Sequence, residues 1–159
     1  MSSGYLSEIS DGEYVRLRRR ALGLTQAQLA EKSGVPQPNI SLIERGKLAV
    51  SPILEARLGP ALYQRPSAIV PVQRTALRRV LASHGIDHPR LFGSVARQTD
   101  DYDSDVDILG VTDMALSLAD KFAIETELER ILATPVDLVI ETTNNRSFLA
   151  QACDDAVEL

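Results

Sequence analysis

The sequence has 159 residues, of which 44% are hydrophobic and 25% charged, a length that suits one ordinary domain or two small ones. No apolar run approaches the roughly 18 residues of a membrane-spanning helix, and the polar N-terminus lacks the pattern of a signal peptide. Because Cys153 is the only cysteine, an internal disulfide is excluded, and we expect a reducing, cytoplasmic location.

The net charge of −5 is divided unevenly along the chain. Residues 1–66 contain nine Lys and Arg against six Asp and Glu, whereas residues 67–159 contain eight against sixteen. The balance is therefore +3 in the first part and −8 in the second. A mildly basic part followed by a strongly acidic one indicates two units with different partners, so we expect one domain at 1–66 and another at 67–159.

The first unit is predicted to consist of short helices separated by glycine-containing turns. Apolar spacing predicts helices over about residues 11–22, 25–34, 36–46 and 51–64, the last broken near Gly59-Pro60. Thr25 is placed to cap the second helix, with Gln28 at the capping-box position. Two prolines bracket residues 63–71, which indicates a linker.

The segment Leu24–Lys47 resembles the helix-turn-helix of the Cro and phage-repressor (XRE-type) family, and the resemblance covers about residues 16–62. A recognition helix needs short polar side chains near its N-terminus that reach base edges in the major groove. Side chains of this kind are Gln37, Asn39 and Ser41. The resemblance implies backbone phosphate contacts from Gln26, Arg45 and Lys47.

Pro38 stands where this family often has a polar base reader, so one base contact is lost. A proline in the first helical turn is tolerated, and the fold prediction is therefore unaffected. Repressors of this type usually bind paired half-sites as dimers, which implies a homodimer on a palindromic operator. The alternative is a small helical bundle without a role in DNA binding.

From Val72 onward, helices alternate with short strands. The pattern predicts helices over 72–85, from about 114 to 133 and over 146–159. It predicts strands at 90–94, 105–111 and 136–140, with an acidic loop between the first two strands. This alternation indicates an α/β or α+β unit. The predicted fold class is thus an all-α domain of four to five helices followed by an α/β domain.

Two aspartates, Asp105 and Asp107, lie within a predicted strand that is otherwise apolar. Residues two apart in a strand point to the same face, so these carboxylates project together while Val106 and Ile108 face the core. Close carboxylates repel each other unless a cation lies between them, and Mg²⁺ favours oxygen ligands with room for phosphates. If the strand containing Asp137 is a neighbour, three carboxylates meet in an arrangement suited to nucleotidyl transfer.

Gly93 and Ser94 follow a short predicted strand and open a helical turn. Glycine lets the backbone approach a phosphate, and amides at the start of a helix attract anions. The Ser94 hydroxyl can donate a hydrogen bond, and Arg97 lies one turn further along, where it can face the same phosphates. The pattern predicts a phosphate site close to the carboxylates.

Together these motifs resemble the DNA polymerase β-type nucleotidyltransferase superfamily, and within it the minimal nucleotidyltransferase group. The family pattern Gly-Ser-x-Ala-Arg-Gly corresponds to residues 93–98, and Ser-Asp-x-Asp with a following apolar residue corresponds to 104–108, with Asp137 as the later aspartate. The resemblance spans residue 72 to the C-terminus and implies a small mixed sheet. Gln98 replaces the usual glycine, which leaves the turn after Arg97 as an open question.

The resemblance implies that Asp105 and Asp107 bind the Mg²⁺ ions that carry the triphosphate of ATP. Asp137 would complete the second metal site and help to activate an acceptor hydroxyl, while Gly93 and Ser94 would hold the β- and γ-phosphates. The alternative for each aspartate is a solvated strand end.

Other candidates have plainer interpretations. Solvated loop residues are expected at Asp100, Asp101 and Asp103. His84 is interpreted as a helix cap, His88 as a loop residue and Cys153 as a core residue. Two interpretations, a DNA contact or a solvated helix face, stay open for Arg18, Arg19 and Arg20.

Proteins that resemble the second domain commonly act as antitoxins of HEPN-type RNase toxins, to which they transfer AMP. The resemblance therefore implies an Mg²⁺-dependent protein adenylyltransferase that uses ATP, binds its toxin and represses its own operon, as a homodimer or as a hetero-oligomer with the toxin. One alternative is a non-catalytic regulator whose nucleotidyltransferase fold only binds nucleotide or toxin. A transferase acting on a small molecule of the aminoglycoside type ranks lower, because the short chain leaves little surface for a drug pocket.

Overall fold

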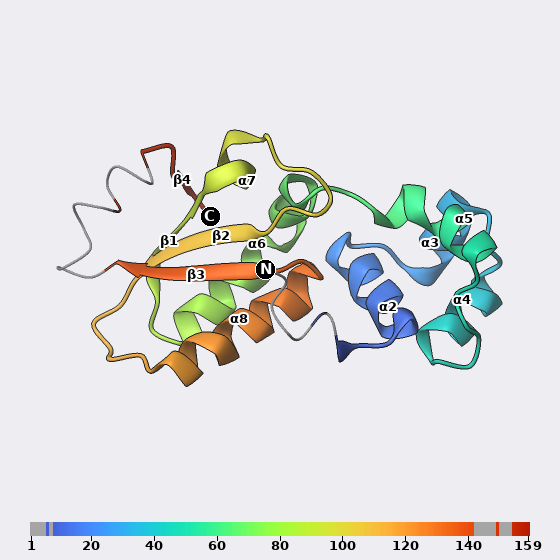
Figure 1. Ribbon diagram of the computed structural model, residues 1–159, viewed down its shortest axis with the longest axis horizontal. Coiled ribbons are helices and arrows are strands. Elements are labelled where there is room, and N and C mark those ends of the chain that lie inside the picture. Colours follow the sequence, from blue (N-terminus) through green and yellow to red (C-terminus); the bar gives the residue numbers. More distant parts are fainter. Residues whose placement is uncertain (1–5, 7, 142–148, 150–153) are drawn as a thin grey trace.

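The computed structural model describes residues 6, 8–141, 149 and 154–159, which form a helical unit and a sheet covered by helices (Figure 1). The helical unit comprises α2 (Asp11–Ala21), α3 (Gln26–Ser33), α4 (Gln37–Glu44) and α5 (Pro52–Leu62). The second unit comprises α6 (Pro66–Ser83), β1 (Asp87–Phe92), α7 (Gly93–Arg97), β2 (Val106–Val111), α8 (Leu118–Leu132), β3 (Val136–Glu141) and β4 (Val157–Glu158). The predicted fold class, a helix-turn-helix followed by an α/β unit with a small mixed sheet, is confirmed.

Local capping signals determine the limits of α3. The Thr25 hydroxyl accepts a hydrogen bond from the Gln28 backbone N–H at 3.1 Å, and the Gln28 side chain accepts one from the Thr25 N–H at 2.8 Å. The predicted capping box is therefore formed. Gly34 follows the helix in the left-handed conformation, with φ of 68°, which a residue with a Cβ adopts only at a cost.

The two predicted interruptions around α5 and α6 are wrong. Pro60 lies inside α5, where its missing N–H removes one hydrogen bond on an exposed part of the helix without ending it. Helix α6 begins at Pro66 and continues through Pro71, so the connection from α5 is only residues 63–65 instead of the predicted linker over 63–71. A proline at the first helical position costs no hydrogen bond, which explains the early start of α6.

Asp100 is a structural residue of the acidic loop. Its Oδ2 accepts a hydrogen bond from the Ser67 backbone N–H at 2.7 Å, so it caps the first turn of α6 and favours that helix end electrostatically. The side chain is 5% exposed, so the interpretation of Asp100 as a solvated residue is wrong. Asp101 and Asp103 are exposed, in agreement with the prediction.

The strands form one sheet in the order β3-β2-β1-β4, with β2 and β3 parallel and the other pairs antiparallel. Helices α6 and α8 cover one face, on which Val106 and Ile108 are fully buried as the alternation predicted (Figure 1). Strand β4 pairs with the edge of β1, so the predicted C-terminal helix is wrong at Val157 and Glu158. Of that predicted helix, residues 146–148 and 150–153, with Cys153, lie outside the described residues.

Helix α2 contributes to the hydrophobic cores of both units. Val15 packs in the core of the helical unit, whereas Leu17 and Ala21 pack with apolar residues of α6, α8 and the sheet. Arg18 of the same helix lies between the two units and is 1% exposed. It donates hydrogen bonds to the carbonyls of residues 62, 64 and 133 and to the Thr134 hydroxyl. The two units are therefore joined by a buried polar contact as well as by apolar packing.

The open question about the three arginines of α2 has a different answer for each. Arg18 is buried between the units, and Arg19 forms an ion pair with Glu44, so neither is a DNA contact or a solvated residue. Arg20 is exposed.

None of the described helices combines the length and the apolar character that crossing a bilayer requires.

Candidate functional site

Asp107 and Asp137 lie opposite each other on neighbouring parallel strands. In the register of β2 and β3 their Cα atoms are partners, and Phe92 of β1 is the partner of Asp107 on the other side. Asp105 immediately precedes β2, two residues before Asp107. The strand arrangement that would bring the three aspartates together is therefore present.

The environment of Asp107 disfavours its negative charge. Burial and the neighbouring carboxylates of Asp105 and Asp137 raise the pKa of Asp107 to about 6, and Arg97 acts in the opposite direction. Asp107 is half-buried, while Asp105 and Asp137 are exposed. A cation bound here would offset the repulsion among the carboxylates, so the chemistry of the donor set fits a hard divalent cation.

The side chain of Asp137, in contrast, is turned toward α8. Its Oδ1 accepts a hydrogen bond from Lys121 Nζ at 3.1 Å, and the same ammonium lies 3.2 Å from Glu125 Oε1. Among the described residues, no group of three or more His, Cys, Asp or Glu side chains has an arrangement that could hold a metal ion. Asp105 and Asp107 thus fit a cation as a pair, whereas Asp137 Oδ1 is engaged by Lys121.

Gly93 packs directly against Asp107. Its φ is 69°, and a Cβ at this position would lie 2.2 Å from Asp107 Oδ2 and 3.2 Å from its Cγ. Only glycine fits both the conformation and the space. Gly93 also begins α7. Its backbone, which is predicted to bind phosphate, therefore lies beside the Asp107 carboxylate, which is predicted to bind a metal ion.

The residue after Arg97 has a backbone conformation that glycine adopts readily. Gln98 has φ of 57° and ψ of 30°, the left-handed conformation, so its substitution for glycine leaves the turn intact at a cost of about 1 kcal/mol. Arg97 is exposed, and its guanidinium lies 2.7 Å from Asp155 Oδ2. Ser94 is half-buried in the first turn of α7.

The predicted DNA-contacting residues of the helix-turn-helix are linked by a chain of hydrogen bonds. Gln37 Nε2 donates to Gln26 Oε1 at 2.8 Å, and Gln26 Nε2 donates to Glu44 Oε2 at 2.9 Å. Arg19 holds Glu44 through two hydrogen bonds, of 2.5 and 2.9 Å. Gln26 and Gln37 are thereby oriented together, at the starts of α3 and α4.

Sequence reasoning missed Glu44 and Arg19 as supporting residues. Their contacts join residues 18 and 25 positions apart, so no local pattern reveals them. Asn39 and Ser41 are half-buried on α4, whereas Arg45 and Lys47 are exposed just after it. All of the predicted DNA contacts therefore lie on α3, α4 and the turn that follows α4.

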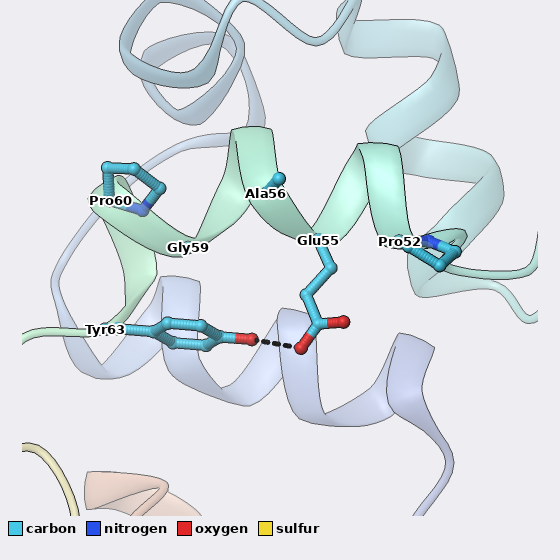
Figure 2. Close-up of a pocket in the computed structure, with 6 residues that line it drawn as sticks. All are labelled: Pro52, Glu55, Ala56, Gly59, Pro60 and Tyr63. Atoms are coloured by element: carbon cyan, nitrogen blue, oxygen red, sulfur yellow. Dashed lines mark hydrogen bonds between the residues drawn. The ribbon is translucent and has the colours of Figure 1, made fainter.

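A separate pocket of about 460 Å³ is formed by residues of α5 and by Tyr63, which follows it (Figure 2). In it the Tyr63 hydroxyl donates a hydrogen bond to Glu55 Oε1 at 3.1 Å. Its lining residues are Pro52, Glu55, Ala56, Gly59, Pro60 and Tyr63. None of the predicted site residues belongs to this lining, so the pocket is distinct from the candidate metal and phosphate site.

Comparisons with known proteins match both parts of the chain. A family model described as "Polymerase beta, Nucleotidyltransferase" matches residues 76–159, and one described as "Helix-turn-helix" matches residues 15–54. An uncharacterized HTH-type transcriptional regulator of Methanothermobacter thermautotrophicus is 44% identical over 48 residues, which cover 30% of this chain and 70% of that protein.

A solved structure described as a candidate minimal nucleotidyltransferase is 29% identical, with a TM-score of 0.48, and the match covers 58% of this chain and 95% of the other. The predicted metal and phosphate residues all lie within residues 76–159, which the nucleotidyltransferase model matches. The predicted DNA-contacting residues all lie within residues 15–54, which the helix-turn-helix model matches.

Proposed function

Because the chain belongs to the polymerase beta nucleotidyltransferase family and carries an N-terminal helix-turn-helix DNA-binding region of the transcriptional-regulator type, we propose that it transfers AMP from ATP to a partner protein and represses its own operon. The pairing of Asp107 with Asp137, next to Asp105 and Gly93, is the observation that supports the enzymatic part most strongly. The partner in this proposal is a HEPN-type toxin, and the location is the cytoplasm.

In the proposed reaction, Asp105 and Asp107 hold Mg²⁺, which when bound offsets the negative charge of the triphosphate. The Gly93 backbone and the Ser94 hydroxyl bind the terminal phosphates, with Arg97 as a nearby positive charge. Asp137 accepts the proton of the acceptor hydroxyl. The acceptor oxygen then bonds to the α-phosphorus of ATP as the bond to the β-phosphate breaks, and pyrophosphate leaves.

The DNA-binding part of the proposal uses the surface formed by α3 and α4. Gln37, Asn39 and Ser41 read base edges, while Gln26, Arg45 and Lys47 contact phosphates. The balance of +3 over residues 1–66 favours contact with DNA despite the acidic chain. A palindromic operator bound by two copies of the chain completes the proposal.

The enzymatic proposal is tested by incubating the protein with ATP labelled at the α-phosphate, Mg²⁺ and the HEPN-type protein of the adjacent gene. We expect the wild type to label that protein and the Asp105→Ala and Asp107→Ala variants to lose the transfer. Asp103→Ala is the matched control, because this exposed aspartate lies in the same loop and we expect it to leave transfer unchanged. Absence of label with the wild type, or equal labelling by Asp107→Ala, would reject the proposal.

A second candidate is a regulator whose nucleotidyltransferase fold only binds nucleotide or the partner. The Lys121–Asp137 ion pair favours it, because the ammonium neutralises the third carboxylate without a metal ion. This candidate predicts that Asp107→Ala leaves both operator binding and neutralisation of the partner unchanged.

A further inference from the structure

Helix α8 carries exposed apolar residues on its outer side, in its first two turns. Leu118 and Phe122, one turn apart, are 69% and 57% exposed, and Ala119 and Ala123 beside them are exposed as well. We call these four residues the α8 apolar face. Covering large apolar side chains of this kind is favourable, because it removes apolar surface from water.

The pattern of α8 changes halfway along the helix. Its inner side buries Ile124, Leu128 and Leu132 completely, together with Glu125 and Glu129. The outer side of the second half is polar, as a surface helix normally is, with Thr126 and Arg130. The apolar outer surface is thus confined to the N-terminal half, and helix formation alone does not require it.

The α8 apolar face adjoins the candidate active site. Lys121 lies between Leu118 and Phe122 in the helix, and its ammonium donates to Asp137 Oδ1 at 3.1 Å. Helix α8 runs alongside β3, the strand that carries Asp137 (Figure 1). A macromolecule that brings a hydroxyl group to Asp137 therefore has this face within its reach.

The charges around the face indicate what kind of partner fits it. Asp120 and Glu127 are exposed on the same helix, and residues 67–159 have a balance of −8. Nucleic acids and anionic membranes are repelled by such a surface. A protein with an apolar centre and a rim of Lys and Arg is complementary to it.

We propose that the α8 apolar face is the docking surface for the protein acceptor, which covers Leu118 and Phe122 and presents its hydroxyl group next to Asp137. The inference rests on the proposed function and extends it, because it assigns the acceptor-binding surface. Docking there also places the acceptor against Lys121, the residue that holds Asp137 in this structure.

The test compares the full-length wild type with the double variant Leu118→Ser, Phe122→Ser. Both side chains are exposed, so the fold tolerates the change. Ile53→Ser is the matched control, because Ile53 is 70% exposed but lies on α5 of the helical unit. The probe is the purified HEPN-type protein, and the measurements are its Kd, the kcat and KM of transfer, and the oligomeric state of each variant by sedimentation.

We expect the double variant to bind the probe about tenfold more weakly or worse, with KM for the probe raised by a similar factor. The KM for ATP and operator binding should stay as in the wild type, and Ile53→Ser should match the wild type throughout. Equal Kd values for the double variant and the wild type would overturn the docking surface. A double variant that loses self-association but keeps its Kd for the probe would assign the face to a second copy of the chain and overturn the proposal.

The same data separate this proposal from the enzymatic one. If the wild type binds the probe through the face but transfers no AMP to it, the docking surface stands and the proposed function fails. If transfer occurs with the same KM in the double variant, the function stands and the docking surface fails. If the wild type neither binds nor labels the probe, both fail.

Discussion

Gly93 and Gly34 have nearly the same backbone conformation, with φ of 69° and 68°, but very different surroundings. A Cβ at Gly34 would have no atom within 4 Å, whereas one at Gly93 would overlap the Asp107 carboxylate. Alanine at either position costs about 1 kcal/mol of backbone strain. We expect Gly93→Ala to lose about 1–3 kcal/mol more than Gly34→Ala in urea unfolding, since it also displaces Asp107.

Nucleotide binding provides the second measurement for this pair of variants. Gly93→Ala should weaken the binding of MgATP, and Gly34→Ala should leave it unchanged. Equal unfolding free energies for the two variants would mean that Asp107 moves aside without cost, and that the close contact has no structural importance.

Gln98 is strained by its left-handed conformation, with φ of 57°, and its side chain is exposed. Gln98→Gly relieves the strain and should raise the unfolding free energy by about 0.5–1 kcal/mol after the added freedom of the unfolded chain is counted. Gln98→Ala keeps the strain and serves as the control in thermal and urea unfolding. A glycine variant no more stable than the alanine variant would show that this turn is not strained.

At the scale of the elements, α2 joins the two units through Arg18. Burial lowers the pKa of the Arg18 guanidinium, and its hydrogen bonds extend to the end of α5 and to the turn after α8. Arg18→Met removes all of these buried hydrogen bonds at once, so we expect a loss of about 3–5 kcal/mol in urea unfolding. Arg20→Met, at an exposed position of the same helix, should change stability by less than about 0.5 kcal/mol. A loss below about 1 kcal/mol for Arg18→Met would contradict this account.

Glu44 gives the helix-turn-helix a predictable dependence on pH. Burial alone would raise its pKa, but hydrogen bonds from Arg19 and Gln26 outweigh burial and hold the pKa of folded Glu44 below its usual value. A lowered folded pKa means that the stabilisation is complete above the unfolded pKa of about 4.3 and is lost as pH falls through the folded value.

Urea unfolding at pH 6 and pH 3 tests this dependence. The stability difference between the wild type and Glu44→Gln should be larger at pH 6 than at pH 3. Glu31→Gln, at an exposed position of α3, is the control and should differ little from the wild type at pH 6. A wild-type advantage that stays the same or grows at pH 3 would contradict the assignment.

Features that depend on residues close together in the sequence were predictable from the sequence. The Thr25 capping box and the alternation around Asp107 are signals of this kind. The start of α6 depends on Asp100, 33 residues away from Ser67, and β4 forms because it pairs with β1. Such contacts between distant residues leave no periodic pattern, which explains why the C-terminal strand and the short connection at 63–65 were missed.

For the whole molecule, the candidate site was predicted in its composition but only partly in its geometry. The types and spacing of Asp105, Asp107 and Gly93 indicated metal and phosphate chemistry, and the strand register places Asp137 opposite Asp107. The Lys121–Asp137 ion pair and the contact between Gly93 and Asp107 depend on how α8 and α7 pack against the sheet. Packing of this kind cannot be read from spacing along the chain.

The central claim, AMP transfer to a protein by the site at Asp105 and Asp107, is tested most directly by intact-mass spectrometry of the proposed HEPN-type partner after incubation with the wild-type protein, ATP and Mg²⁺. We predict a mass increase of one or more AMP groups on a hydroxyl side chain with the wild type, and an unmodified protein with Asp107→Ala or after chelation of Mg²⁺. An unmodified protein with the wild type, or the same modification with Asp107→Ala, would contradict the claim.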